Sequence, residues 1–412
     1  MPDDQVLIPQ QTRRPPMGEE IRRERLRPEN ENRELTTTKS LDKLAPQTQI
    51  NPMLLDPRYN EEINRNLERA LVAYYPKRPI TDLTTTEKIN LVLSAMKDRE
   101  LFGFSYISNP SVPPKTAEET YALRQGDCDE LSRIFVILGE RVGLNDISQF
   151  YVNFRDRSLG EDFGHAGVFY VEGSIFYIDP ATDKKREFGQ KFKTLNQAMA
   201  DQSFRRWITD IGLQTSGRTG KIEINDIGAI PGKAGCEALY YFEYGAYTFD
   251  NQKWREALEN FKKAEEKGMK SARVYFNIGQ AYYQLDLYSE AASYFEQAVK
   301  KKTDANYYEY LGSSYFHATN YKKAVEAFSA QLKFEPNNRA ALLSLGTACN
   351  EAAEKAMNDG AEQDAFVFFM RAKSPLMKIA HDQNSTQIER ENAKKLLESV
   401  DSRLKELKTK IK

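Results

Sequence analysis

Apolar residues follow different spacings in successive parts of the chain. Between residues 60 and 141 they recur at every third or fourth position, which is the spacing of one face of an amphipathic helix. Short runs rich in β-branched and aromatic residues follow, a composition typical of strands, at 150–154, 166–171 and 175–178. From residue 236 onward the helical spacing returns. The pattern predicts helices, then a small antiparallel sheet, then an all-helical region.

Both ends of the chain differ from the middle. The first aromatic residue is Tyr59, and residues 1–54 carry too little apolar surface to offset the entropy lost on ordering. We expect a disordered, mixed-charge arm there, in which Glu19 to Arg27 is either a solvated stretch or a short helix that binds a second partner. Residues 374–412 carry an apolar stripe on a highly charged helix, which predicts a capping helix or, alternatively, a short coiled-coil surface.

A repeat runs through the helical region. A glycine and a phenylalanine recur at intervals of 34 and then 33 residues, as Gly245, Gly279 and Gly312 and as Phe261, Phe295 and Phe328. A fourth unit begins near Leu342 and needs about seven extra residues around Asp359 to fit the period. Because small residues at this spacing let the two helices of a pair approach closely, residues 236–373 resemble a tetratricopeptide repeat array of four units, the last irregular.

The resemblance implies a concave groove lined by the first helix of each pair, where a partner protein or peptide binds. By register, the side chains expected to face this groove are Phe242, Phe276, Gln280, Tyr283, Glu309, Ser313 and Phe316. Alternatively, some of these aromatic residues only pack between repeats. The lysine-rich clamp with which chaperone-binding members hold a C-terminal carboxylate is not evident at these positions, so the identity of the partner stays open.

Composition narrows the classes of function. The 412 residues include 59 Lys or Arg and 60 Asp or Glu, a net charge of -1, which gives no global reason to expect nucleic-acid or anionic-membrane binding. No apolar run approaches the roughly 18–20 residues that span a bilayer, and no secretory signal is visible. The cysteines are too few for a disulfide framework and lack metal-ligand spacing. We expect a cytoplasmic protein without a membrane span, bound metal or cofactor.

Cys128 stands out among the three cysteines. It begins a predicted helix that runs to Arg141 and stops at Gly143. The unpaired backbone N–H groups and the dipole at the start of a helix favour a thiolate, which is the nucleophilic form. Cys349, by contrast, falls among aliphatic residues in mid-helix. Cys128 is therefore the candidate nucleophile.

His165 and Asp179 flank a predicted β-hairpin. If residues 171–173 form a three-residue loop, Tyr170 pairs with Ser174 and, counting outward, His165 pairs with Asp179. Directly opposed residues share a sheet face, so the carboxylate would hold the imidazole as the third member of a triad. A two-residue turn would instead put the two side chains on opposite faces.

The order of these residues resembles the transglutaminase-like superfamily of papain-like cysteine hydrolases. The resemblance covers residues 80–190 and is carried by three motifs, Gly126-Asp127-Cys128-Asp129-Glu130-Leu131, His165-Ala166 and Asp179-Pro180. It implies that Cys128 is the nucleophile, His165 the general base and acid, and Asp179 the orienting carboxylate. Gly167 follows the His-Ala pair where this family often has an aromatic residue, and this departure leaves the geometry of the substrate pocket open.

The predicted fold is thus α+β at residues 55–230, with a papain/transglutaminase-like core in which the helix bearing Cys128 packs on a small antiparallel sheet. An all-α tetratricopeptide solenoid at 236–373 and a capping helix at 374–412 follow. In the catalytic reading, the backbone N–H of Cys128 is one oxyanion donor, and Gln125 or Tyr121 is a candidate for the second.

These sequence features fit two functions. In the first, the chain is a cysteine peptidase or amidase/deamidase that acts through a thioester and is recruited to its substrate by the repeat array. In the alternative, it is a catalytically silent scaffold of a larger assembly that uses the groove and the N-terminal arm as binding surfaces.

Overall fold

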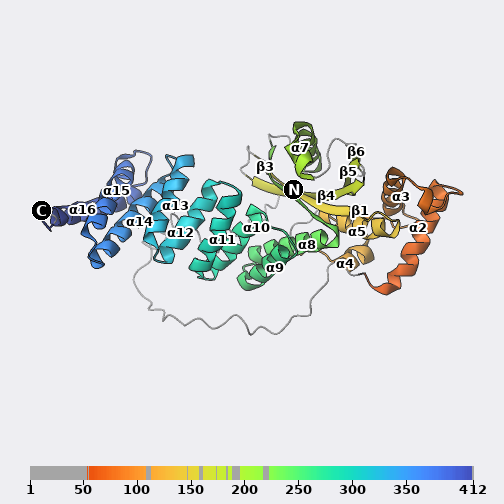
Figure 1. The fold of residues 1–412 in the computed structure, drawn as a ribbon, viewed down its shortest axis with the longest axis horizontal. Helices are drawn as coiled ribbons and strands as arrows, with labels where there is room; N and C mark the ends of the chain where they lie inside the picture. The colour runs from red at the N-terminus through yellow and green to blue at the C-terminus, as the bar shows by residue number, and fades with distance from the viewer. Residues whose placement is uncertain are drawn as a thin grey trace, which may run out of the picture. The chain divides into compact units, whose positions relative to one another are not determined.

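The structure is a computed structural model, and it is mostly helical (Figure 1). It describes residues 53, 55–107, 113–145, 147–156, 161–172, 174–181, 184–187, 195–216 and 222–410. Apart from Met53, the predicted arm of residues 1–54 lies outside the described residues. The chain divides into an α+β unit that extends through α8 (Gly232–Asp250) and a helical unit from α10 (Ala272–Gln284) to α16 (Gln387–Lys410), with residues of α9 (Trp254–Glu266) in both.

Helices form the first part of the α+β unit, as the apolar spacing predicts. They are η1 (Pro57–Tyr59), α2 (Asn60–Tyr74), η2 (Ile80–Asp82), α3 (Thr85–Lys97), α4 (Ala117–Leu123) and α5 (Cys128–Arg141). Capping boxes begin three of them, in which a side chain before the helix and a glutamate three residues later accept each other's backbone N–H. The caps are Thr84, Thr116 and Asp127. The last of these places Cys128 in the first turn of α5.

Five antiparallel strands form a sheet in the second part of this unit. In spatial order they are β6 (Lys184–Glu187), β5 (Ser174–Asp179), β4 (Glu161–Glu172), β3 (Ile147–Asp156) and β7 (Ile222–Pro231). A separate parallel pair joins β1 (Ser105–Tyr106) to β2 (Gln125–Gly126). Because β7 pairs with β3, the chain returns to the far edge of the sheet after α6 (Leu195–Ala200) and α7 (Gln202–Ser216).

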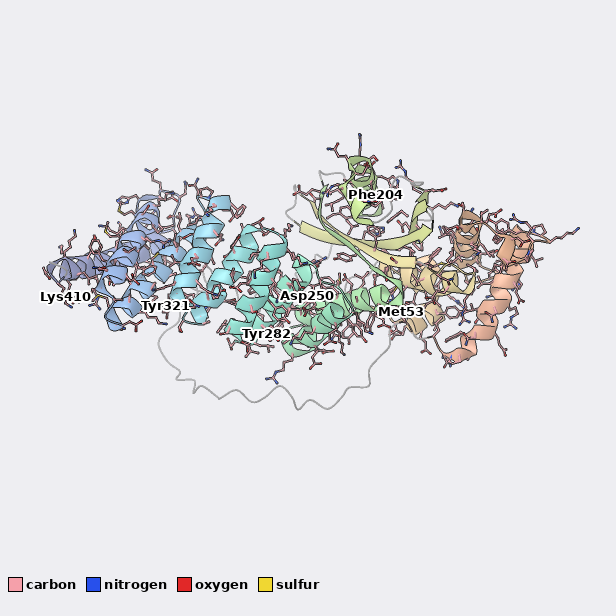
Figure 2. All side chains as sticks on the ribbon, in the orientation of Figure 1. Met53, Phe204, Asp250, Tyr282, Tyr321 and Lys410 are labelled. Carbon is pink, nitrogen blue, oxygen red and sulfur yellow. The ribbon has the colours of Figure 1, made fainter. Side chains whose placement is uncertain are left out.

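The two faces of the sheet pack against different helices (Figure 1). Val168 and Ile178 belong to a core shared with the apolar residues of α2 to α5. Phe150 and Tyr177 belong to a second core, which contains Phe204 of α7 (Figure 2). Since side chains alternate along a strand, each position on β4 and β5 can be assigned to one core or the other.

The helix α8 packs on this unit although the sequence pattern groups it with the repeats. Cys236, near its start, is fully buried in the core that contains Val168. Toward its other end, Gly245 faces Phe261 of α9, as the repeat pattern requires. One helix therefore completes the α+β core and also begins the repeat pattern.

The pairing of β4 with β5 differs from the predicted register by two residues. A three-residue loop at 171–173 would pair Tyr170 with Ser174, but the structure pairs Glu172 with Ser174. This register places Asp179 opposite Gly167. The predicted direct pairing of His165 with Asp179 is wrong. Because the shift is two residues and not one, His165 and Asp179 still lie on the same sheet face.

In the helical unit each helix packs on the next in sequence order (Figure 1). After α10 come α11 (Tyr288–Lys301), α12 (Ala305–His317), α13 (Tyr321–Phe334), α14 (Arg339–Asn358), α15 (Glu362–His381) and α16. The last helix, α16, packs on α15 and buries Val400, Leu404 and Leu407. None of the described helices has the length and apolar character needed to cross a membrane.

Close contacts between glycine and phenylalanine join the two helices of the first three pairs. A Cβ atom on Gly279 would lie 2.7 Å from the Phe295 ring, and one on Gly312 would lie 2.7 Å from the Phe328 ring. These separations are shorter than two carbon atoms allow, so only glycine lets the backbone approach the ring. The recurring residues of the sequence are therefore contact points between paired helices.

The fourth pair is longer than the others. The helices α14 and α15 have 20 residues each, compared with 13 in α12 and 14 in α13. Gly346 of α14 faces Leu376 of α15 instead of a phenylalanine. The extra residues that the period requires are thus absorbed as helix.

Candidate functional site

Cys128 is the first residue of α5, and hydrogen bonds fix the backbone on both sides of it. Asp127 Oδ1 accepts the N–H of Glu130 at 3.1 Å, and Glu130 Oε2 accepts the N–H of Asp127 at 3.1 Å. The hydroxyl of Ser132 donates to the carbonyl of Cys128 at 2.6 Å. The cysteine therefore has a defined backbone position at the start of the helix.

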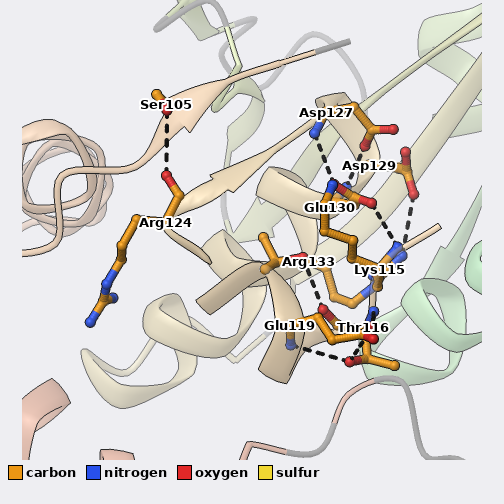
Figure 3. Close-up of polar contacts among 10 residues, drawn as sticks. Ser105, Lys115, Thr116, Glu119, Arg124, Asp127, Asp129, Glu130 and Arg133 are labelled. Carbon is orange, nitrogen blue, oxygen red and sulfur yellow. Dashed lines mark hydrogen bonds and ion pairs between the residues drawn. The ribbon is translucent and has the colours of Figure 1, made fainter. Parts of the chain in front are cut away.

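A buried network of charges supports this turn (Figure 3). Arg133 is fully buried, and its Nη2 lies 3.2 Å from Asp129 Oδ2. Lys115 Nζ lies 2.7 Å from Glu130 Oε2, and the Lys115 carbonyl accepts a hydrogen bond from Arg133 Nη1 at 2.5 Å. Removing one partner of such a pair would leave an uncompensated buried charge, which is strongly destabilising. Arg133 is not among the predicted site residues, although its i,i+4 spacing from Asp129 on a predicted helix indicates such a pair.

His165 and Asp179 are brought together as a buried pair. His165 Nε2 lies 3.1 Å from Asp179 Oδ2, and both side chains are almost inaccessible to solvent. The other carboxylate oxygen, Oδ1, accepts the backbone N–H of Ala181 at 3.1 Å. One oxygen of Asp179 is thus held by the backbone, and the other orients the imidazole of His165 through Nε2. The second ring nitrogen, Nδ1, is therefore the one that can exchange a proton.

The thiol of Cys128 lies against β4. Burial, followed by the nearby carboxyl groups of Asp127 and Asp129, raises the pKa of the Cys128 thiol well above its ordinary value, and a hydrogen bond from the backbone N–H of Ala166 acts in the opposite direction. Desolvation thus opposes the helix N-terminus and disfavours the thiolate that the sequence predicts there. The thiol must pass its proton to a base when it reacts.

The two candidate oxyanion donors lie in different environments. Tyr121 is fully buried, with its ring 5.9 Å from the ring of Phe104 and 3.8 Å from the guanidinium of Arg124. Gln125 is exposed on β2. Tyr121 is a core residue, and Gln125 is the one of the two whose side chain is open to solvent.

Tyr177 is also absent from the predicted site residues. This side chain is fully buried on the sheet face that carries His165 and Asp179, and burial raises the pKa of its hydroxyl well above the ordinary value. The signal that could have found it is strand alternation, since Tyr177 lies two residues before Asp179 and so shares its face.

The side chains predicted to line the groove divide by burial. Four are buried and three are partly exposed. The buried ones are Phe242, Phe276, Tyr283 and Ser313, and the partly exposed ones are Gln280, Glu309 and Phe316.

Two of the buried aromatic residues bridge the first helices of neighbouring pairs, α10 and α12. The Phe276 ring stacks on Tyr307 of α12 with centroids 4.4 Å apart, and Tyr283 meets Tyr310 at 5.7 Å. These rings therefore pack between repeats, the alternative that the sequence left open, and the partly exposed residues are the ones a partner could touch.

The acidic and histidine side chains form no metal site in the part of the chain that the structure describes. There, no group of three or more His, Cys, Asp or Glu side chains is arranged to hold an ion.

Comparison with known proteins identifies the repeats. Residues 247–307 match the family model described as tetratricopeptide repeat. The chain is 31% identical over 123 residues to the Hsp70-Hsp90 organizing protein of Triticum aestivum, a match that covers 30% of this chain and 21% of that protein. It is 37% identical over 67 residues to the type II methyltransferase M.CeqI of Rhodococcus hoagii, over 15% of this chain and 13% of that one. The chain thus spans less than a quarter of either relative's length.

Solved structures similar to parts of the chain include TPR domains. The TPR domain of Arabidopsis OM64 is 20% identical, with a TM-score of 0.26 over 27% of this chain and 93% of that domain. The first TPR of Spaghetti (RPAP3), bound to the HSP90 peptide SRMEEVD, is 24% identical, with a TM-score of 0.27 over 30% of this chain and 94% of that one. MamA is 19% identical, with a TM-score of 0.29 over 46% and 96%. From the family match and the repeat pattern together, the chain contains tetratricopeptide repeats.

Proposed function

We propose that this chain is an adaptor that binds a segment of another protein in the groove of its tetratricopeptide array. The observation that carries this proposal is the family match at residues 247–307, together with the glycine–phenylalanine contacts that continue the repeat through α13. The name of the Triticum aestivum relative, an organizing protein for Hsp70 and Hsp90, agrees with an adaptor role.

The partly exposed groove residues indicate what kind of segment fits. Gln280, Glu309 and Phe316 offer an amide, a carboxylate and an aromatic ring. None of the seven predicted groove positions holds a lysine or arginine that would pair with the carboxylate of an acidic C-terminus. The groove therefore suits a segment that presents apolar side chains and hydrogen-bond donors.

Site-specific photocrosslinking of the full chain tests the adaptor proposal. A benzoylphenylalanine placed at Gln280 or Phe316 should crosslink one partner, whereas the same group at Glu290, exposed on the second helix of the pair, should not. Peptides from the crosslinked region should then bind the purified full chain by calorimetry. Equal crosslinking from all three positions, or peptides that do not bind, would refute a groove-specific partner.

A second function is favoured by the pair of His165 and Asp179. We propose that the α+β unit is a transglutaminase-like cysteine hydrolase in which Cys128 is the nucleophile. The 3.1 Å contact of His165 Nε2 with Asp179 Oδ2 supports this role, since a triad needs an imidazole oriented by a carboxylate. The hydrogen bond from Ala166, the neighbour of His165, to the sulfur of Cys128 adds support.

In this proposal the reaction is acyl transfer at an amide. The proton of Cys128 passes to His165 as the sulfur attacks the carbonyl carbon, and the leaving amine takes that proton as the C–N bond breaks. Water or a second amine then attacks the thioester and restores the thiol. Asp179 keeps the imidazole oriented and stabilises its protonated form.

Thiol labelling tests the hydrolase proposal. An electrophilic amide or epoxide probe should label Cys128 at least tenfold faster than Cys236 and Cys349, which are fully buried. His165→Ala should remove the difference, because no base then accepts the thiol proton. Equal labelling of the three cysteines in the unmodified protein would refute the hydrolase proposal but would not bear on the adaptor proposal.

A further inference from the structure

Three exposed apolar side chains lie along one side of α15. Val367, Met370 and Met377 are 54%, 48% and 46% exposed. Single exposed apolar residues are common on protein surfaces, but these three belong to one helix. At about 100° per residue they point within about 80° of one another, and they extend over about 15 Å of the helix axis. We call these three residues the α15 stripe.

The second helices of the preceding pairs, α11 and α13, are mostly polar on their exposed sides. The one exposed aromatic side chain there, Phe334, stacks on Tyr308 of α12. The other exposed side chains are polar or charged: Ser289, Glu290, Ser293, Lys300 and Lys301 of α11, and Lys322, Lys323, Glu326 and Lys333 of α13. The repeat fold therefore does not require exposed apolar residues on a second helix, and a group of them on one face is typical of a binding surface.

Positive charge lies beside the stripe. Arg371 and Lys378 are exposed on one flank of it, two helical turns apart. Neither has an ion-pair partner among the residues that the structure describes, whereas Lys373 of the same helix pairs with Asp401 at 2.6 Å. Residues 365–381 include no aspartate or glutamate. The surface thus combines apolar side chains with positive charge.

A cavity lies at the end of the stripe that Lys378 marks. Lys378 and Ile379 line it together with Asn338 and Arg339 at the start of α14, and its volume is about 670 Å³. An elongated stripe that leads to a hollow suits a peptide segment better than the flat surface of a membrane.

We propose that the α15 stripe binds an acidic amphipathic helix of a partner protein. Apolar side chains at spacings of three, four and seven residues on that helix pack on the three residues of the stripe. Carboxylates on its flank pair with Arg371 and Lys378. Methionine is unbranched and adapts to the shape of its neighbours, so the two methionines suit a surface that docks a partner.

This surface is additional to the groove of the proposed adaptor. The predicted groove positions lie on α8, α10 and α12, whereas the stripe lies on α15. An adaptor with both surfaces holds two segments at once, from one partner or from two.

Fluorescence anisotropy of the full chain with two matched peptides tests the proposal. The first peptide, of about 18 residues, carries leucine along one helical face and glutamate on the flanks, and the second has lysine in place of each glutamate. We expect the acidic peptide to bind about tenfold more tightly than the basic one, and Arg371→Glu to remove most of this difference. Added salt should weaken the acidic peptide, because Arg371 and Lys378 are exposed.

Substitutions on and off the stripe identify the surface that binds. Val367→Glu and Met370→Ser should each weaken the acidic peptide about tenfold, since each removes an apolar contact. Phe334→Ser, at an equally exposed apolar residue of α13, is the matched control and should change the affinity by less than about twofold. Phe316→Ser in the groove should also leave the affinity unchanged, so the stripe and the groove are tested separately. Thermal melts check that each variant is folded.

Three results would overturn the proposal. The first is equal binding of the acidic and basic peptides, or no binding of either. The second is an affinity that Val367→Glu and Met370→Ser change no more than Phe334→Ser does. The third is that the stripe substitutions abolish dimerisation of the full chain, or its binding to vesicles of phosphatidylserine and phosphatidylcholine, and leave peptide affinity unchanged. The stripe would then be a surface for self-association or for a membrane.

Discussion

At the start of α5 the carboxyl group of Asp127 has two effects on the protein. It caps the helix by accepting the N–H of Glu130. Burial, followed by the neighbouring carboxylate of Asp129, also raises the pKa of Asp127 to about 8, so the side chain is largely protonated at neutral pH. A carboxyl group whose folded pKa lies above its unfolded value of 3.8 contributes stability below pH 3.8, and this contribution is lost as the pH rises through about 8.

Replacing Asp127 with asparagine should remove this pH dependence. Asparagine is also a good N-cap and carries no charge at any pH. We expect the difference in Tm between Asp127→Asn and the unmodified protein to become more positive between pH 5.5 and pH 8.5, measured by thermal melts in matched buffers. A difference that stays constant over this range would contradict the protonated carboxyl.

Single residues also show how far the sequence could predict the site. The sequence predicts that His165 and Asp179 meet as a directly opposed pair, and they do meet although the strand register differs. The alternation of side chains along a strand determines the sheet face on which each residue lies, whereas the turn determines which residue lies directly opposite it. The state of the Cys128 thiol could not be predicted in this way. The start of a helix is visible in sequence, but the desolvation of a sulfur by distant segments is not.

At the scale of elements, the contact between glycine and phenylalanine holds the helix pairs together. The fixed period made this contact predictable, since it depends on residues 16 positions apart in one hairpin, as Gly279 and Phe295 are. The aromatic residues between successive hairpins were harder to place. Phe276 was expected in the groove and is covered by Tyr307, because contacts between repeats depend on the superhelical stacking, which no local pattern encodes.

A double-mutant cycle should measure the glycine contact. Gly279→Ala puts a methyl group 2.7 Å from the Phe295 ring and should destabilise the array by about 1–3 kcal/mol, as overpacking does. Phe295→Leu in the same chain removes the obstructing ring edge, so the two changes together should cost less than their sum. Urea unfolding of the four proteins gives the coupling energy.

Ser289→Ala is the control for this cycle. Ser289 is exposed on α11, and its replacement should change the free energy of unfolding by less than about 0.5 kcal/mol. Additive effects of the Gly279 and Phe295 changes would contradict a direct contact between the two positions.

At the scale of the whole molecule, each of the two units has its own hydrophobic core. Each also has one buried cysteine, whose chemical labelling can report when that unit opens. Cys236 is fully buried in the α+β core, and Cys349 is fully buried in α14 of the helical unit. Burial raises the pKa of each thiol to about 12, so both react slowly until the surrounding structure opens.

Destabilising one unit should therefore expose only its own cysteine. Gly279→Ala should speed the labelling of Cys349 about tenfold for each 1.4 kcal/mol of lost stability and leave Cys236 unchanged. Ile178→Ala, in the core that contains Cys236, should do the reverse. Labelling rates read by mass spectrometry in native buffer check both, and a joint rise of the two rates would mean that the units open as one.

The long fourth hairpin has a consequence for how the array tolerates changes of length. Its first helix exceeds that of the third pair by seven residues, since α14 has 20 residues and α12 has 13. Seven residues make two helical turns with only about 20° of residual rotation, so the packed face of the lengthened helix keeps its direction. Insertions or deletions in this hairpin should therefore be accepted in steps of two turns, whereas a step of five residues would rotate the apolar stripe out of the stack.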